Sequence, residues 1–161
     1  MRMRNKILLT ILLAVLCSWL FGREREHYVP IPSPETANGE TDVAYLQQLY
    51  AVYNEAYFHN RLTKTPRIDL SETSNNMATT FCKNENDTDC EIEFNEKYVA
   101  APRVADFTML HEQCHVKTWM KDTDDFGIQI DHGKMWRSCM LELDAEGAFR
   151  QIFIDNYRED M

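Results

Sequence analysis

Two histidines four residues apart constrain this chain more than any other feature, because that spacing brings their side chains together only on a helix. His111 and His115 flank Glu112 in the stretch LHEQCHVKTW, residues 110–119. On a helix, residues i and i+4 lie on one face with Cβ atoms roughly 5–6 Å apart, so two imidazoles there can bind one cation. The same helical side carries a mostly apolar set of residues, Val104, Phe107, Cys114 and Thr118. The histidines therefore extend a stripe that faces the core.

The chemistry of this stretch depends on whether a third ligand joins the two histidines. Neutral imidazole suits zinc, and catalytic zinc sites usually have three protein ligands. We expect His132, in the stretch DHGKMW at 131–136, to be the third, because the preceding loop is long enough to reverse the chain. A carboxylate from Glu142 or Glu146 is the alternative. Glu112 then stands beside the metal as a general base; the competing interpretation is a pair of ordinary core histidines.

Hydrophobic periodicity predicts three helical regions. The first starts near Thr41 or Asp42, either of which can cap it, and carries a stripe of large side chains: Leu46, Leu49, Tyr50, Tyr53 and Tyr57. The second starts at Pro102 and carries the histidine pair. The third follows His132, and Gly147 is a point at which it can divide into two helices. We interpret all three stripes as core faces.

Between the first two helical regions, three short runs alternate apolar and polar residues. They predict strands at 66–70, 77–82 and 90–95, joined by turns rich in Asn, Ser and Asp. The second and third strands are the expected hairpin. The fold class that follows is α+β, with a short antiparallel-rich sheet and the H-E-x-x-H helix, preceded by an N-terminal apolar helix.

The first 22 residues differ in character from the rest of the chain. The cationic head MRMRNK precedes fifteen uncharged residues, 7–21, so that 1–22 resembles a signal peptide or signal-anchor. A buried helix of the domain is the alternative, and the run is shorter than the roughly 20 residues that cross a bilayer comfortably. Residues 23–40, with proline at every second position from 30 to 34, predict an extended linker. The domain, 41–161, is then membrane-anchored or exported, on the non-cytoplasmic side.

The charge balance argues against a nucleic-acid partner. All 26 acidic residues follow Gly22, but only 14 of the 17 Lys and Arg do, so this part carries a net charge of −12. A surface this acidic repels a phosphate backbone unless its basic residues cluster. No such cluster is visible in the sequence.

The cysteines and aspartates leave several interpretations open. Cys82 and Cys90 bracket a polar turn, so they can close a disulfide across the hairpin if the domain is exported, or remain two free thiols. Cys114 and Cys139 lie in helical patterns and are interpreted as small core residues. Three aspartates, Asp122, Asp124 and Asp125, lack the spacing of a calcium loop and are interpreted as a solvated turn.

Taken together, residues 43–145 resemble the SprT-like metalloproteases, which include the Spartan type of DNA–protein crosslink proteases. The stretch YNEAYFHNRL at 53–62 is similar to the opening helix of the family. The stretches MATTFC and EIEFNEKYV are similar to its hairpin and to the strand before the active-site helix. The most specific similarity is LHEQCH followed by HGKMW, the zinc signature of the family.

The resemblance implies a small α+β zincin domain with one Zn²⁺, in which His111, His115 and His132 are ligands and Glu112 is the catalytic base. The leading hypothesis is a zinc-dependent endopeptidase that acts on a protein or peptide substrate. Two alternatives stay open at this point. One is a non-catalytic domain that zinc stabilises. The other is an intracellular, DNA-linked protease of the same family.

Overall fold

The structure is a computed structural model of the 161-residue chain, and it describes residues 41–62, 66–72, 75–83, 89–150 and 152. The expected N-terminal apolar helix, the signal or anchor at 1–22 and the linker at 23–40 lie outside these residues. Within the described ranges, no helix is both long enough and apolar enough to cross a membrane.

Helix α2, Val43–Phe58, is the first described element, and it forms where the aromatic stripe predicts it. The Asp42 side chain caps its start by accepting a hydrogen bond from the Tyr45 backbone N–H at 2.7 Å. The helix ends at His59, which adopts the left-handed conformation with φ 56°. The stripe is confirmed as core, since its five residues are all buried: Leu46, Leu49, Tyr50, Tyr53 and Tyr57. Tyr45 and Phe58 on the same helix are buried as well.

The sheet has three strands in the order β1-β3-β2, formed by Arg67–Ser71, Ala78–Cys82 and Cys90–Asn95. Strands β2 and β3 form the predicted antiparallel hairpin. Strand β1 pairs with β3 in parallel, so the expected antiparallel-rich sheet holds for only one of the two pairings. The sequence predicted the strands and the β2–β3 hairpin, but not the parallel pairing of β1 with β3. Strand β2 is left at one edge of the sheet.

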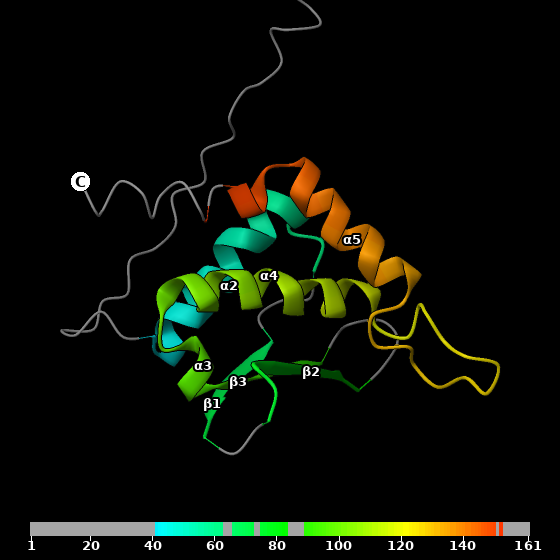
Figure 1. Cartoon of the computed structure of the whole chain (residues 1–161), viewed down its shortest axis with the longest axis horizontal. Coiled ribbons are helices and arrows are strands. Elements are labelled where there is room, and N and C mark those ends of the chain that lie inside the picture. The colour runs from blue at the N-terminus through cyan, green and yellow to red at the C-terminus, as the bar shows by residue number, and fades with distance from the viewer. Residues whose placement is uncertain (1–40, 63–65, 73–74, 84–88, 151, 153–161) are drawn as a thin grey trace, which may run out of the picture.

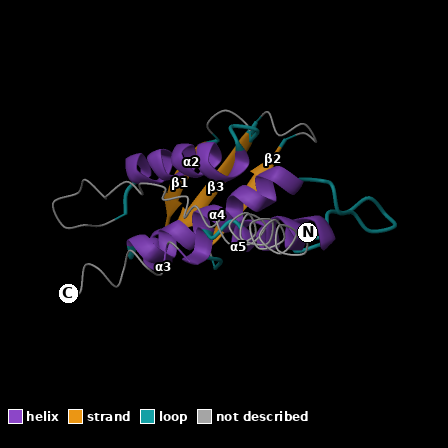
Figure 2. Ribbon diagram, turned by 90° about the horizontal axis from the view of Figure 1, so that it is seen from above, coloured by secondary structure: helices purple, strands orange, loops and turns teal. Residues whose placement is uncertain are grey.

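The labelled helices that follow the sheet in the described part of the chain are α3, Glu96–Val99, α4, Pro102–Thr118, and α5, Lys134–Ala145. Figure 1 shows α4 lying between the sheet and α5. Figure 2 shows α2 and α4 on the same face of the sheet. Helix α4 contacts α2, α3, α5 and β2, and is therefore the central element of the domain.

Helix α4 is held on several sides by packing and by long-range hydrogen bonds. Gln113, which is fully buried, donates from its side chain to the Tyr50 backbone oxygen at 2.8 Å. The Tyr45 hydroxyl donates to the Asp106 carboxylate, also at 2.8 Å. Buried polar contacts of this kind fix the position and rotation of a helix, because breaking them leaves unsatisfied groups in the core. The histidine pair on α4 therefore has a rigid support.

Two disulfides connect these elements. Cys82 and Cys90 are joined across the β2–β3 hairpin, with an S–S distance of 2.05 Å. Cys114 on α4 and Cys139 on α5 are joined as well, at 2.00 Å. The interpretation of this second pair as simple core residues was therefore incomplete. Both side chains are buried, but helical periodicity shows only that each faces inward, and not that the two faces meet.

Candidate active site

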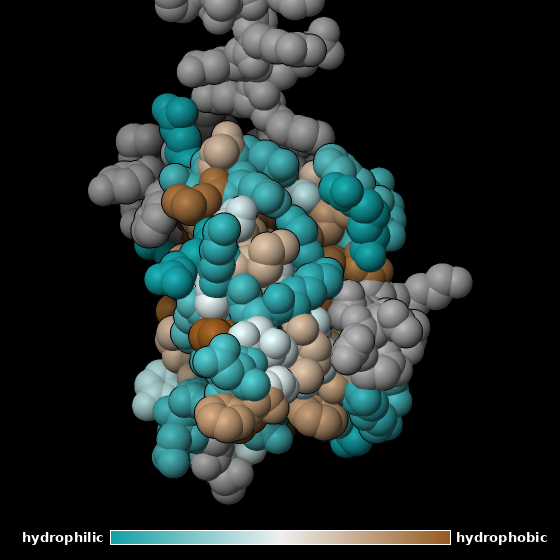
Figure 3. Space-filling view, turned by 90° about the vertical axis from the view of Figure 1, so that its right-hand side faces the viewer, coloured by the Kyte–Doolittle hydropathy of each residue, from teal (hydrophilic) through white to brown (hydrophobic). Residues whose placement is uncertain are grey.

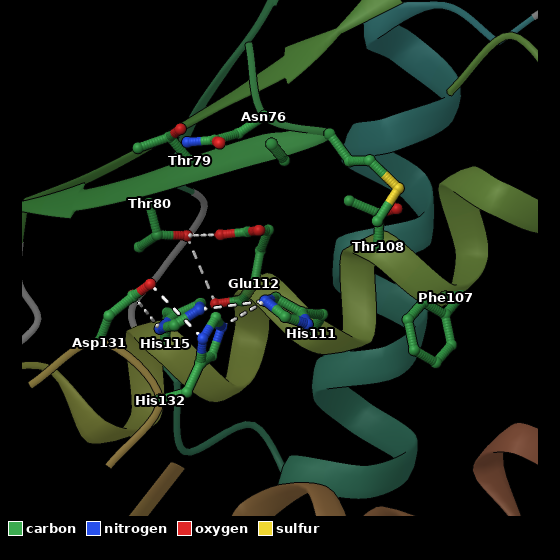
Figure 4. Close-up of a pocket in the computed structure, with 12 residues that line it drawn as sticks. Asn76, Thr79, Thr80, Phe107, Thr108, His111, Glu112, His115, Asp131 and His132 are labelled. Carbon is green, nitrogen blue, oxygen red and sulfur yellow. Dashed lines mark hydrogen bonds and ion pairs between the residues drawn. The ribbon is translucent and has the colours of Figure 1, made fainter. Parts of the chain in front are cut away.

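Three imidazoles converge beside α4, as Figure 4 shows. His111 and His115 come from successive turns of α4, and His132 comes from the loop just before α5. The His111 Nε2 lies 3.2 Å from the Nε2 of His115 and 3.1 Å from the Nε2 of His132. A tetrahedral zinc ion with Zn–N bonds of about 2.0–2.1 Å holds its nitrogen ligands about 3.3 Å apart. The donor set fits one metal ion, because both of these distances are close to that spacing and a ligand atom from each of the three residues lies within 4.8 Å of the others.

The charge state of the histidines also suits a cation. Burial lowers the pKa of His111 to about 4, and the neighbouring imidazoles act in the same direction. Burial likewise lowers the pKa of His115 to about 4, although Asp131 opposes the change. Both rings are therefore neutral at pH 7, with lone pairs free for a metal.

Asp131 lies behind two of the three rings and was not singled out from the sequence. One of its oxygens is 3.7 Å from His115 Nδ1, and the other is 3.5 Å from His132 Nδ1. A carboxylate placed behind the ligating nitrogens orients imidazoles toward a metal. Its position next to His132 is the only sequence clue to this role.

His132 is positioned by a cap on α5 that the sequence did not reveal. Asp122 accepts a hydrogen bond from the Met135 backbone N–H at the start of α5, and its own backbone oxygen accepts from Ile130 at 2.8 Å. Gly133 permits this approach, since a Cβ there would lie 2.5 Å from the Cβ of Asp122. The interpretation of the aspartates as a solvated turn is thus wrong for Asp122, which is half-buried and fixes the chain on both sides of His132.

Trp136 forms a wall against all three histidines. Its ring stacks on His115 with centroids 5.5 Å apart, and meets His111 and His132 edge-on at 4.7 and 4.2 Å. In the sequence, Trp136 closes the stretch HGKMW, but no role in the site was predicted for it. Its spacing of four residues from His132, at the start of a helix, is the signal that could have found it.

Glu112 is buried beside the histidines, with only 3% of its surface exposed. Its Oε2 accepts a hydrogen bond from the Thr80 hydroxyl of β2 at 2.7 Å. Burial raises the pKa of Glu112 to about 7, although the hydrogen bond from Thr80 opposes the rise and Asp131 adds to it. A carboxyl with a pKa near the working pH can both accept and return a proton. Thr80 was missed because strand alternation places it inward but does not say which helix residue it meets.

The histidines open into a cleft of about 280 Å³. One wall is the edge strand β2 together with the residues just before it, and the other is α4. The remaining candidates for third ligand lie elsewhere along α5: Glu142 pairs with Lys117 at 2.6 Å, and Glu146 follows the last turn. Within the described part of the chain, His132 alone completes the cluster that His111 and His115 begin.

The chain was compared with known families, proteins and structures. The sequence profile of the SprT-like family matches residues 46–157, which is more than half of the chain. No curated protein and no solved structure gave a significant match. The matched range contains the sheet, the histidine cluster and Glu112. The chain therefore belongs to the SprT-like family, which is generally associated with metallopeptidase-like activity.

Proposed function

We propose that this domain is a zinc-dependent endopeptidase. The observation that carries the proposal is the convergence of three histidine Nε2 atoms beside a buried carboxylate, at the floor of an open cleft. In this proposal His111, His115 and His132 are the ligands and Glu112 is the general base. Three nitrogen donors would hold the ion, which is the number of protein ligands that catalytic zinc sites usually have.

Zinc is the metal that the donor set favours, because three imidazoles without a carboxylate suit its preference for nitrogen. A bound zinc ion supplies the Lewis acidity that makes water nucleophilic at neutral pH and polarises a peptide carbonyl. The closed alternative, a purely structural zinc site, usually has four protein ligands. In the described ranges, the group of side chains here whose ligand atoms are close enough to share one metal ion has three members, which favours the catalytic hypothesis.

Glu112 has the position and environment of a base rather than a ligand. Its carboxylate lies on the β2 side of the imidazoles and is held there by Thr80 (Figure 4). We expect it to take a proton from the attacking water and to deliver that proton to the leaving amine. No nucleophilic side chain is needed, so no acyl-enzyme forms.

A polypeptide substrate fits the shape of the site. Strand β2 is an edge strand, so backbone groups along it are open to pairing with an extended chain in the cleft. The cleft is bounded by β2 and α4 and continues past the histidines to Asp131. We therefore expect cleavage within a chain rather than removal of a terminal residue.

The location that we propose is membrane-anchored through residues 7–21 or exported, with the domain on the non-cytoplasmic side. Two observations support it: the apolar N-terminal run, and the two disulfides, which persist in oxidising compartments. Nucleic acid remains an unlikely partner in this proposal, because the net charge after Gly22 is −12, from 14 basic and 26 acidic residues.

Metal-dependent proteolysis tests the proposal. The purified full chain should contain one zinc per chain and cleave an unfolded protein such as reduced casein. A chelator should abolish this cleavage, and added Zn²⁺ should restore it. A chain that holds zinc but cleaves nothing would favour a non-catalytic zinc domain, whereas tight, salt-sensitive binding to DNA would favour a DNA-linked role.

A further inference from the structure

The loop between α4 and α5 presents three large apolar side chains to solvent. Phe126 is 88% exposed, Ile128 64% and Ile130 47%. They lie on the apolar hairpin, the name used here for residues 121–131, which projects from the domain beyond the end of α4 (Figures 1 and 2). We propose that the apolar hairpin is a docking element for the substrate, and that it selects polypeptide segments in which apolar residues stand beside basic ones.

The apolar hairpin has its own internal bonding, so its apolar residues are not needed to shape it. The Asp124 carboxylate accepts hydrogen bonds from the backbone N–H groups of Phe126 and Ile128, both at 2.9 Å. The Asp124 backbone N–H donates to the Ile128 carbonyl at 2.8 Å, and Gly127 supplies the positive φ of the turn, 77°. A turn held in this way can present a side chain at its tip in a fixed place.

Exposed apolar residues are common singly, but here three occur within five residues of one turn. Ile128 and Ile130 are two residues apart, a spacing that puts side chains on one side of an extended arm. Figure 3, which looks at the side of the molecule to the right in Figure 1, shows apolar patches separated by hydrophilic ones. Since the turn does not require these side chains, binding to a partner is the function that accounts for them.

The apolar hairpin leads directly into the candidate active site. Its last residue is Asp131, which lines the cleft with His132. Asp131 lies five positions after Phe126, a span of at most about 18 Å for an extended chain. A substrate bound in the cleft would therefore contact the hairpin through residues that lie about five or six positions from the bond that is cleaved.

Charge decides between a polypeptide and a membrane as the partner. The apolar hairpin contains four aspartates and one lysine, and Asp125 and Asp131 are exposed. Anionic lipid surfaces attract basic segments and repel acidic ones, so this hairpin is poorly suited to insert in them. A polypeptide with lysine or arginine next to its apolar residues would match both the apolar side chains and the aspartates of the hairpin.

A binding experiment tests this inference separately from the proposed function on which it rests. The zinc-loaded full chain carrying Glu112→Gln is titrated with a labelled twelve-residue peptide whose second half alternates leucine and lysine. Adding Phe126→Ser and Ile128→Ser should raise the Kd about tenfold or more, because two apolar contacts are lost. The control is Leu141→Ser, since Leu141 is 69% exposed on α5 and should leave the Kd unchanged.

Two further arms separate the outcomes. A peptide with serine in place of leucine should bind weakly to every variant. In the active chain, the hairpin substitutions should raise KM for casein while leaving the cleavage rate of a four-residue peptide unchanged. Equal Kd values for the parent and the hairpin variant would overturn the inference, even if casein is cleaved normally. Sedimentation with phosphatidylserine vesicles that depends on Phe126 would overturn it in favour of a membrane.

Discussion

The two halves of the candidate metal centre are held in different ways. His111 and His115 lie on α4, which packs against other elements on most of its sides. His132 lies in an exposed connection that is fixed by the cap from Asp122 and, through α5, by the disulfide at Cys139. The first half is part of the core, whereas the second is attached to the core at a few points. This difference implies that changes in the half that carries His132 can abolish metal binding while the fold remains.

Replacement of His132 should give the largest effect. His132→Ala removes one of three donors and its contact with Trp136, but it leaves the core packing in place, because His132 is exposed. We expect zinc content to fall sharply and proteolysis to be abolished, while the apo-protein keeps its circular dichroism spectrum. His111→Ala on α4 provides the comparison, and should cost stability as well as metal. An undiminished zinc affinity in His132→Ala would show that another residue is the third ligand.

Loss of the disulfide between α4 and α5 should have the next largest effect. Replacing Cys114 and Cys139 by alanine opens a link between residues 25 apart, which costs about 3.5 kcal/mol of unfolding free energy in the chain-entropy treatment. Urea unfolding measures this directly. Replacing Cys82 and Cys90, only 8 apart, should cost about 2.5 kcal/mol and leave zinc affinity unchanged. If the two variants lost zinc affinity equally, the disulfide between α4 and α5 would not be a specific support for the half of the metal centre that carries His132.

Gly133→Ala should weaken only the half of the metal centre that carries His132. The added Cβ collides with the Asp122 side chain, and relief of such overpacking typically costs about 1–3 kcal/mol. We expect the cap to shift and zinc affinity, measured by competition with a chelator, to fall about tenfold or more. Gly127→Asn is the control in the same loop, since asparagine tolerates its positive φ and nothing lies near its Cβ. Similar zinc affinities for the two variants would contradict the account of Gly133.

Thr80→Val should give the smallest effect, and on rate rather than on metal. Valine keeps the shape of Thr80 but removes the hydroxyl that holds the Glu112 carboxylate. Hydrogen bonds to charged groups contribute about 1.5–3 kcal/mol, so kcat should fall about tenfold or more while KM and zinc content stay constant. Thr80→Ser should restore most of the rate. A fall in zinc content, or no rescue by serine, would indicate a structural role only.

The same division explains what the sequence could predict. Helical periodicity in the stretch 104–118 was enough to place the first two histidines on one inward face, with Glu112 one position round the helix from His111, because that information is local. His132 was predicted as a ligand only because a catalytic site needs a third ligand beside the two histidines. Its supports, Asp122 and Trp136, depend on contacts across the chain that one sequence does not display. The parallel pairing of β1 with β3 was missed for the same reason.

The activity of Glu112→Gln shows whether Glu112 is the general base of this site. Glutamine keeps the size of the side chain and an oxygen for the Thr80 hydrogen bond, but it cannot accept a proton from water. Zinc content and melting temperature should therefore match the parent, while cleavage of casein should fall by about 10²–10⁴-fold. Cleavage at the parental rate, with zinc retained, would contradict the mechanism proposed for this site.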